Sequence, residues 1–228
     1  MHIGLIGGIG PAATVVYYQR LTALMRERGK PLELTIVQAD VDDLVRNNLA
    51  DNRAEQAEIY RGLIDRLRDA GAACAAITSL GGHFCYDETV ALSSLPLVSA
   101  VAPLDAYFME KGLSIIGLLG TEVVMRTRLY GQLAQTMAVA PETNMQDVGD
   151  AYRHMAVRGI CDQAERTLFF EAGRRMVEDQ GAEAIVLAGT DLNLAYDGYD
   201  PGYRVIDALD VHVGVLADLA SGAMQLTG

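Results

Sequence analysis

Short apolar runs alternate with longer amphipathic stretches along the chain, and this alternation predicts its elements. Apolar runs that end near a turn residue are typical of buried parallel strands, and the longer stretches have helical spacing. Helices are predicted near residues 12–28, 52–70, 84–93 and 101–111. The predicted strands lie in "HIGLIGG", "LELTIVQAD", "AACAAITS", "LPLVSA", "SIIGLLGT", "MAVAP" and "AEAIVLAGT". The pattern predicts an α/β fold in which helices cover parallel sheets.

The same plan occurs twice. "IGLIGG" at 3–8 resembles "IGLLGT" at 116–121, and "GAACAAITS" at 71–79 resembles "GAEAIVLAG" at 181–189. The two pairs of motifs have nearly the same separation along the chain, which favours a duplication of half the chain. We therefore expect two α/β lobes, the first formed by residues 1–98 and 210–228 and the second by residues 99–209. Ser79 and Gly189 then hold equivalent places, and a small-molecule cleft is expected between the lobes.

Composition narrows the classes of partner. The chain has 228 residues, of which 50% are hydrophobic, and a net charge of −12. This acidity argues against nucleic acid or an anionic membrane as a partner, although a few arginines can still hold an acidic ligand locally. The three cysteines, at positions 74, 85 and 161, lack metal-ligand spacing, so we expect no metal and a cytoplasmic location. No signal peptide or membrane span is predicted.

The first glycine loop, "GGIGPAAT", allows three interpretations. Gly8, Gly10 and Ala13 satisfy the loose dinucleotide pattern, but the acidic residue that would hold the ribose, Asp40, comes late. Pro11 suits the first position of a helix, with backbone N–H groups left free for a carboxylate. The third interpretation is a purely structural turn.

Four motifs together resemble the pyridoxal-phosphate-independent aspartate/glutamate racemase family. They cover essentially the whole chain and read "IGLIGGIGPAAT", "NNLADNR", "GLLGTEVVMRTRLY" and "VIDALDVHVGVLADLA". The resemblance implies two doubly wound parallel-sheet lobes related by a pseudo-twofold, with the active-site cleft between them. It also implies a homodimer, an amino-acid substrate and no cofactor. In that family one thiolate removes the Cα proton and an opposing thiol protonates the other face.

This chain departs from the family where the two cysteines belong. Its first turn reads Ser79-Leu80-Gly81-Gly82-His83 and its second Ala188-Gly189-Thr190-Asp191. Ser79 and Gly189 stand in the cysteine places, and Leu80 and Gly81 replace an Asn and a Thr that would hold a carboxylate. A helix lysine of some aspartate-specific members falls at about Glu165. We therefore expect ordinary racemisation of aspartate or glutamate to be weak or absent.

The candidate residues have both functional and structural interpretations. Ser79 either acts with His83 as a base or only caps a helix or binds substrate. The cysteines are interpreted as packing residues, with Cys161 placed in a helix. The candidates for catalysis are Ser79, His83, Asp191 and the emptied position Gly189. The candidates for ligand binding are Gly8, Ile9, Gly10, Thr14, Arg53, Leu80, Gly81, Thr121 and Thr190, while Arg126, Arg128 and the "AYDGYDPGY" loop at 195–203 are either site or surface.

Three hypotheses for function stay open. The first is an enzyme that binds a small carboxylate or amino acid and has altered chemistry, such as a one-base isomerase or a lyase or decarboxylase. The second is a non-catalytic carboxylate-binding or regulatory protein. The third is a racemase with an unusual base, to be sought among His83, His212 and Asp191. Because Leu80 and Gly81 replace polar anchors, one end of the ligand is expected to be less polar than in aspartate.

Overall fold

The computed structural model describes residues 1–226 and divides into two compact units. Unit 1 comprises Met1–Ala100 and the chain from Asp210 on, and unit 2 comprises Val101–Leu209. The lobe bounds expected from the sequence, 1–98 with 210–228 and 99–209, stay a prediction. In the described part of the chain, no helix has both the length and the apolar character needed to cross a membrane.

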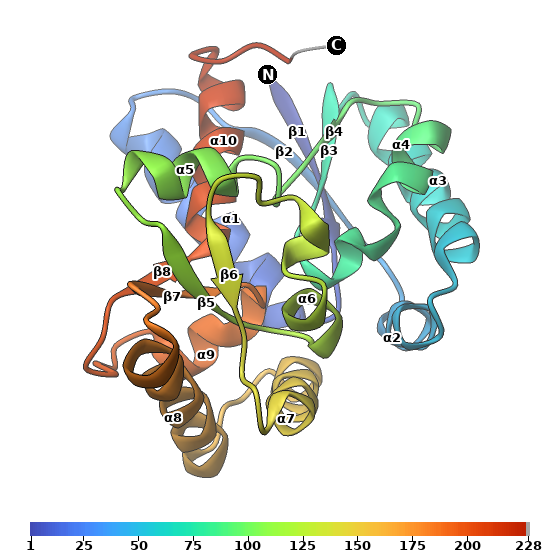
Figure 1. Cartoon of the computed structure of the whole chain (residues 1–228). Helices are drawn as coiled ribbons and strands as arrows, with labels where there is room; N and C mark the ends of the chain where they lie inside the picture. The colour runs from blue at the N-terminus through green and yellow to red at the C-terminus, as the bar shows by residue number, and fades with distance from the viewer. Residues whose placement is uncertain (227–228) are drawn as a thin grey trace. The chain divides into compact units, whose positions relative to one another are not determined.

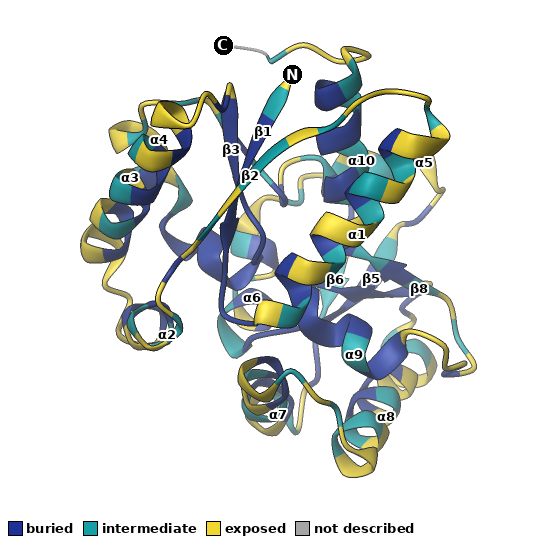
Figure 2. Cartoon of the chain, turned by 180° about the vertical axis from the view of Figure 1, so that it is seen from behind, coloured by how far each residue is buried: buried dark blue, intermediate teal, exposed yellow. Residues whose placement is uncertain are grey.

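The sheet of unit 1 is parallel, with the order β2-β1-β3-β4. Its central strands are buried along nearly their whole length, which explains their continuous apolar sequence, whereas β2 at the edge is half exposed. In Figures 1 and 2, α3 and α4 lie on one side of this sheet and α1 and α10 on the other. The strands are β1 (His2–Gly7), β2 (Glu33–Gln38), β3 (Cys74–Ile77) and β4 (Leu97–Val98).

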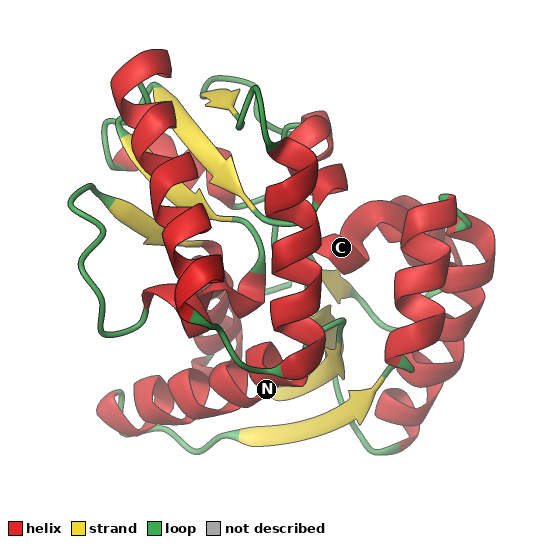
Figure 3. Cartoon of the chain, turned by 90° about the horizontal axis from the view of Figure 1, so that it is seen from below, coloured by secondary structure: helices red, strands yellow, loops and turns green. Residues whose placement is uncertain are grey.

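The helices of unit 1 begin with α1, whose first residue is a proline preceded by Gly10. The turn after β3 is a 3-10 helix that leads directly into α4. Figure 3 distinguishes the helices, strands and loops of the chain by colour. The helices are α1 (Pro11–Glu27), α2 (Val41–Ala50), α3 (Arg53–Asp69), the 3-10 turn η1 (Gly81–Cys85), α4 (Tyr86–Leu92) and α10 (Ala208–Ser221), which begins in unit 2.

Unit 2 repeats this arrangement with the parallel order β6-β5-β7-β8. Its strands are β5 (Ile115–Leu119), β6 (Met137–Val139), β7 (Ala184–Leu187) and β8 (Val205–Asp207). Helix α8 packs on β5 and β7. The helices are α5 (Leu104–Glu110), α6 (Glu122–Arg126), η2 (Leu129–Gly131), α7 (Met145–Arg158), α8 (Gln163–Gln180), η3 (Thr190–Leu192) and α9 (Asn193–Tyr196).

The strand register confirms the internal repeat. Ile3 of β1 pairs with Cys74 of β3, and Ile116 of β5 pairs with Ala184 of β7. Ile116 follows Ile3, and Ala184 follows Cys74, by the same separations as the repeated sequence motifs. The two units are therefore two copies of one topology, and the predicted α/β class with two doubly wound parallel-sheet lobes is correct. The predicted pseudo-twofold and the cleft between the lobes stay predictions.

Two local predictions were wrong. Helix α2 was not expected, because Asp and Asn crowd "VDDLVRNNLADN" and lower its helical propensity. Its N-cap Asp40 accepts the Asp43 N–H at 3.0 Å, so acidic residues that discourage a helix interior instead start this one. Cys161 lies between α7 and α8 and not in a helix, and it is only half-buried, so it is not a core packing residue.

Candidate functional site

The turn after β3 places Ser79 in a tight, buried position. Ser79 is 2% exposed, and its Oγ accepts the Gly82 N–H at 3.3 Å. A Cβ on Gly8 would lie 2.3 Å from the Ser79 Cβ, so the first glycine loop fits closely against this turn only because Gly8 has no side chain. The hydroxyl therefore acts as a cap of the turn, which agrees with the capping interpretation of Ser79.

His83 is fixed by backbone groups through both ring nitrogens. Nε2 accepts the Ala100 N–H at 3.0 Å, so Nδ1 carries the proton and donates to the Ser79 carbonyl at 2.8 Å. Burial lowers the pKa of His83 to about 4, and the ring stacks on Tyr86 with centroids 5.3 Å apart. In this geometry His83 bonds to the carbonyl of Ser79 and not to its hydroxyl, which disfavours His83 as the base that activates Ser79.

His212 is equally enclosed in unit 1. Its Nδ1 lies 2.8 Å from the Tyr17 hydroxyl, and burial lowers the pKa of the imidazole to about 3. A neutral histidine with no solvent-exposed surface stabilises the packing of α10 on α1. This geometry disfavours His212 as an unusual base.

The first glycine loop has the features of an anion-binding helix start. The N-cap of α1 is Gly10, which has no side chain to bond to the backbone N–H groups of the first turn, and Pro11 occupies that turn. Both features are expected for a helix start that binds an anion. Ile9 is buried, and the Thr14 hydroxyl lies 2.9 Å from that of Thr78. Asp40, the acid that a dinucleotide site would use, is occupied as the N-cap of α2, which weighs against that interpretation.

Arg53 lies in an open depression that is already rich in carboxylates. Its Nε donates to Asp51 at 2.8 Å, and Nη1 lies 3.9 Å from Glu88. The hydrogen bond with Asp51 raises the pKa of the guanidinium. The depression has a volume of about 480 Å³ and is lined by Asp51, Asn52, Arg53, Ala54, Glu55 and Glu88. A ligand carboxylate must therefore compete with the protein's own carboxylates for Arg53.

In unit 2, the turn after β7 is filled by a tyrosine that the sequence did not single out. A Cβ on Gly189 would lie 2.3 Å from Cε2 and 2.6 Å from Cζ of Tyr152. The ring thus takes the space of the absent side chain. The Tyr152 hydroxyl donates to Asp191 at 3.4 Å, and both side chains are about 1% exposed. Burial and the charge of Asp191 raise the pKa of Tyr152 well above its usual range, so the phenol keeps its proton.

The remaining candidates in unit 2 have structural partners. The Thr121 hydroxyl caps α6 by accepting the Val124 N–H at 3.3 Å. Arg128 donates to the carbonyls of Met125 and Ala138, and Arg126 is an exposed residue 3.6 Å from Glu122. Thr190 is buried in η3, beside Asp191.

Other predicted site or surface residues also have assigned contacts. Glu165 forms the capping box of α8 with Asp162 and binds Arg158 through both carboxylate oxygens. In the 195–203 loop, Tyr203 donates to the Phe170 carbonyl of α8 and lies 3.0 Å from the Tyr196 hydroxyl. This loop is therefore fastened to α8.

The cysteines offer no thiolate at the strand-end turns. Cys74 is buried in β3, and Cys85 is buried at the end of η1 with its Sγ 3.7 Å from the Thr89 hydroxyl. Burial raises the pKa of each of these two thiols to about 11, so both stay protonated at neutral pH. Among the described residues, no group of three or more His, Cys, Asp or Glu side chains could hold a metal ion.

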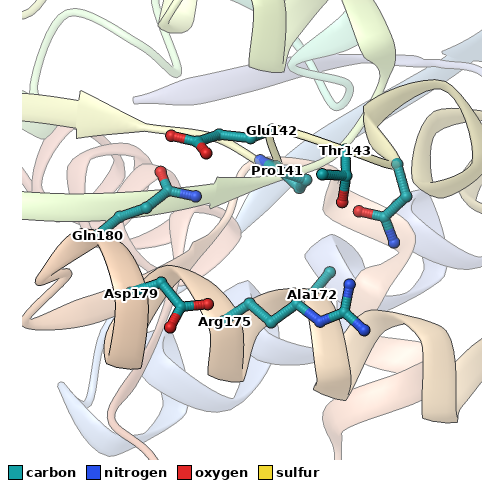
Figure 4. Close-up of a pocket in the computed structure, with 8 residues that line it drawn as sticks. Pro141, Glu142, Thr143, Ala172, Arg175, Asp179 and Gln180 are labelled. Carbon is teal, nitrogen blue, oxygen red and sulfur yellow. The ribbon is translucent and has the colours of Figure 1, made fainter.

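A separate groove lies within unit 2, between the segment before α7 and the face of α8 (Figure 4). It has a volume of about 280 Å³ and carries charges of both signs, from Arg175 and from Glu142 and Asp179. None of the residues predicted for the site lines it. The lining residues are Pro141, Glu142, Thr143, Asn144, Ala172, Arg175, Asp179 and Gln180.

The match to a family model decides the identity of the fold. Residues 6–216 match the model described as Asp/Glu/Hydantoin racemase. The chain belongs to the Asp/Glu/hydantoin racemase family. The resemblance found in the four sequence motifs is therefore correct.

Solved racemase structures share this fold. An aspartate racemase homologue from Pyrococcus horikoshii is 23% identical, with a TM-score of 0.77 over 96% of this chain and 99% of that one. The Picrophilus torridus aspartate racemase is 18% identical, with a TM-score of 0.74 over 100% and 96%. The Francisella tularensis glutamate racemase, solved in complex with D-glutamate, is 11% identical, with a TM-score of 0.68 over 100% and 84%. At these identities the likeness shows the fold alone.

Proposed function

We propose that this racemase-family protein binds a small carboxylate or amino acid at its strand-end turns and does not invert it by the two-thiol mechanism. The residues proposed to hold the ligand are the Gly8–Gly10 loop, Thr14, Arg53, Leu80, Gly81, Thr121 and Thr190. The glycine loop and the start of α1 supply backbone N–H groups for a carboxylate. Leu80 and Gly81 carry no polar side chain in the first turn, which supports a ligand with one less polar end, and the Leu80 side chain itself is fully buried.

One observation supports the loss of two-base inversion above all others. In the second turn, Gly189 is the residue equivalent to Ser79. The ring of Tyr152, which keeps its proton, fills the space that a side chain at position 189 would need. Inversion needs a base on one face of Cα and an acid on the other, both within about 2.6–3.2 Å of the atoms they serve. Ser79, the remaining group, is a poor base because His83 makes no bond to its hydroxyl.

The residues at the second turn are compatible with proton transfer at one face of Cα only. A buried carboxylate, Asp191, and a neutral phenol, Tyr152, supply hydrogen-bonding groups in unit 2. Asp191, as an acceptor, supports one-base exchange at Cα, and the Tyr152 phenol, as a donor, supports stabilisation of the carbanion that remains when CO2 leaves. The third group considered as an unusual base, Asp191, is a carboxylate that can accept a proton, but it is as buried as His212 and already accepts the Tyr152 hydroxyl.

A non-catalytic binding protein is the second candidate. The geometry of His83 favours it, because both nitrogens of the nearest imidazole to Ser79 are used by the backbone. Ser79 itself is engaged as a cap. In this alternative the turns retain ligand binding and have lost proton transfer.

A ligand screen followed by isotope exchange separates the candidates. Thermal shift against small carboxylates and amino acids identifies binders, and each binder is then incubated with the protein in D2O. Cα exchange without racemisation supports the one-base enzyme, and binding without exchange or turnover supports the binding protein. Conversion of L-aspartate to D-aspartate at roughly tens of turnovers per second, a typical enzyme rate, would contradict the proposal.

The family resemblance also led us to expect a cytoplasmic homodimer, and both features stay predictions. Light scattering coupled to size-exclusion chromatography measures the oligomeric mass directly. A monomer at micromolar concentration would contradict the predicted dimer.

A further inference from the structure

Two side chains at equivalent positions of the repeat reach the two strand-end turns. Helices α2 and α7 begin at Val41 and Met145, and Leu34 of β2 and Ala138 of β6 hold equivalent places in the strand register. Each of these pairs has the same separation along the chain, and so do Asn48 of α2 and Tyr152 of α7. The duplication thus makes Asn48 and Tyr152 counterparts, although an amide and a phenol have no obvious relation in sequence.

Their hydrogen bonds are counterparts as well. The Asn48 Nδ2 donates to the Gly81 carbonyl at 2.9 Å, and the Tyr152 hydroxyl donates to Asp191 Oδ2 at 3.4 Å. The number of residues between Gly81 and Asp191 is the same as the number between Cys74 of β3 and Ala184 of β7, which are equivalent in the strand register. Each unit therefore uses the same helix position to hold the same turn position, two residues after Ser79 or Gly189.

Burial makes these contacts important for the position of each turn. Asn48 is 7% exposed and Tyr152 is 1% exposed, and each hydrogen bond joins segments that are distant in sequence. A buried acceptor that loses its donor is costly, so each turn is held where its donor can reach it. Tyr152 also fills the side-chain space at Gly189, which restrains the second turn by packing.

We propose that Asn48 and Tyr152 are matched positioning residues that set the geometry of the two ligand-binding turns. Asn48 acts through the Ser79–Gly81 segment and Tyr152 through the Gly189–Asp191 segment. The role in ligand binding rests on the proposed function, whereas the role in holding the turns does not. The two roles therefore need separate measurements.

Backbone amide exchange measures the turns without any ligand. In full-length Asn48→Ala, exchange in the peptide that covers residues 79–85 should rise roughly fivefold, as expected for one lost hydrogen bond. In Tyr152→Phe, which keeps the ring, the same rise is expected for residues 189–193. If Asn48→Ala does not fold, Asn48→Leu removes the donor, keeps a similar side-chain volume and adds no charge.

Matched controls separate positioning from general stability. Asn47→Ala removes a buried asparagine of the same helix that bonds to Gln56 and not to the turn. Tyr203→Phe removes a hydroxyl in unit 2 that bonds to the Phe170 carbonyl. Both controls should leave exchange in the two turns unchanged. Unchanged exchange in the turns of Asn48→Ala or Tyr152→Phe, or an equal rise in the controls, would overturn the proposal.

A second measurement tests the link to ligand binding, with succinate, L-aspartate and L-leucine as probes in calorimetry. For any probe that binds the wild type, Asn48→Ala and Tyr152→Phe should raise Kd by roughly fivefold or more, and the controls should not. Unchanged affinity in both variants would overturn the role in binding. If no probe binds the wild type, the proposed function fails for these ligands, and the exchange result still decides whether the two residues hold the turns.

Discussion

At the level of single residues, Gly189 and Tyr152 share one space at the end of β7. The backbone at Gly189 (φ −115°, ψ 114°) suits any L-residue, so what excludes a side chain there is the Tyr152 ring 2.3 Å from its Cβ position. The obstacle to a side chain at Gly189 is therefore steric, and it comes from Tyr152 of helix α7. This constraint bears directly on attempts to restore a cysteine.

We predict that Gly189→Cys alone destabilises the protein by about 1–3 kcal/mol, the usual effect of overpacking a tight core. In a Tyr152→Ala background the same change should cost far less, because the ring is absent. Urea unfolding of the two single variants and the double variant measures the coupling energy between the positions. Additive effects, with coupling near zero, would show that the ring does not occupy this space.

The corresponding prediction for activity follows from the same geometry. Ser79→Cys with Gly189→Cys should not restore racemisation of aspartate, and any recovery should require a smaller residue at 152 as well. Chiral chromatography of the product measures this. A double variant that racemises aspartate as well as the triple variant would contradict the prediction.

Arg53 gives a prediction about charge. We expect Arg53→Ala to weaken binding of a carboxylate by about 1.5–3 kcal/mol, the range for a charged hydrogen bond. Asp51→Asn should instead strengthen binding, because it releases the Nε that Asp51 now holds. Calorimetry on both variants distinguishes the cases. An unchanged Kd in both would remove Arg53 from the site.

At the level of elements, the strands were predictable from the sequence and helix α2 was not. Continuous apolar runs such as those of β1, β3, β5 and β7 have few alternatives to a buried parallel strand, and the duplication confirmed them. Helix α2 was missed because its stability comes from a cap and from buried contacts of Asn47 and Asn48. Helical propensity, which considers each residue by itself, does not include those contacts.

The candidate site was predictable only in part, for a related reason. The sequence identified both turns, because glycine and hydroxyl residues follow the strands there. It could not show that Tyr152, far before Gly189 in the chain, fills the second turn, since no local pattern joins the two. Nor could it show that both nitrogens of His83 are bonded to backbone groups, one of them at Ala100.

The 195–203 loop yields a prediction at this scale. A Cβ on Gly173 of α8 would lie 2.2 Å from the Tyr203 hydroxyl, so Gly173→Ala should push this side chain off the helix. Limited proteolysis should then cut the loop faster, while Glu171→Ala, an exposed change on the same helix, should leave the cleavage rate unaltered. A loop equally resistant in both variants would show that Tyr203 does not fasten it.

At the level of the whole molecule, two buried histidines make unit 1 sensitive to acid. His83 and His212 have pKa values lowered by burial to about 4 and about 3, against 6.5 for an ordinary histidine. Below pH 6.5 the unfolded chain binds protons at these positions and the folded chain does not. Stability therefore falls as pH decreases from about 6.5 toward 4.

The expected size is about 3 kcal/mol for each histidine across that window, as an order of magnitude. Urea unfolding at several pH values measures the slope. His83→Gln should reduce the loss of stability between pH 6.5 and 4, whereas His154→Gln, a change at an exposed position, should leave that loss unchanged. Identical slopes in the wild type and His83→Gln would contradict this account.

The discontinuity of unit 1 has a consequence for synthesis on the ribosome. Unit 2 is one continuous segment, so all of its parts are available as soon as Leu209 has left the exit tunnel. Unit 1 lacks α10 until Ala208–Ser221 has been synthesised, and the amino group of Met1 bonds to the Ala220 carbonyl at 2.9 Å across 219 positions. Contacts between such distant positions close late. The unit begun first is thus completed last, and the face of its sheet that α10 will cover is the part of the nascent chain most exposed to chaperones and aggregation.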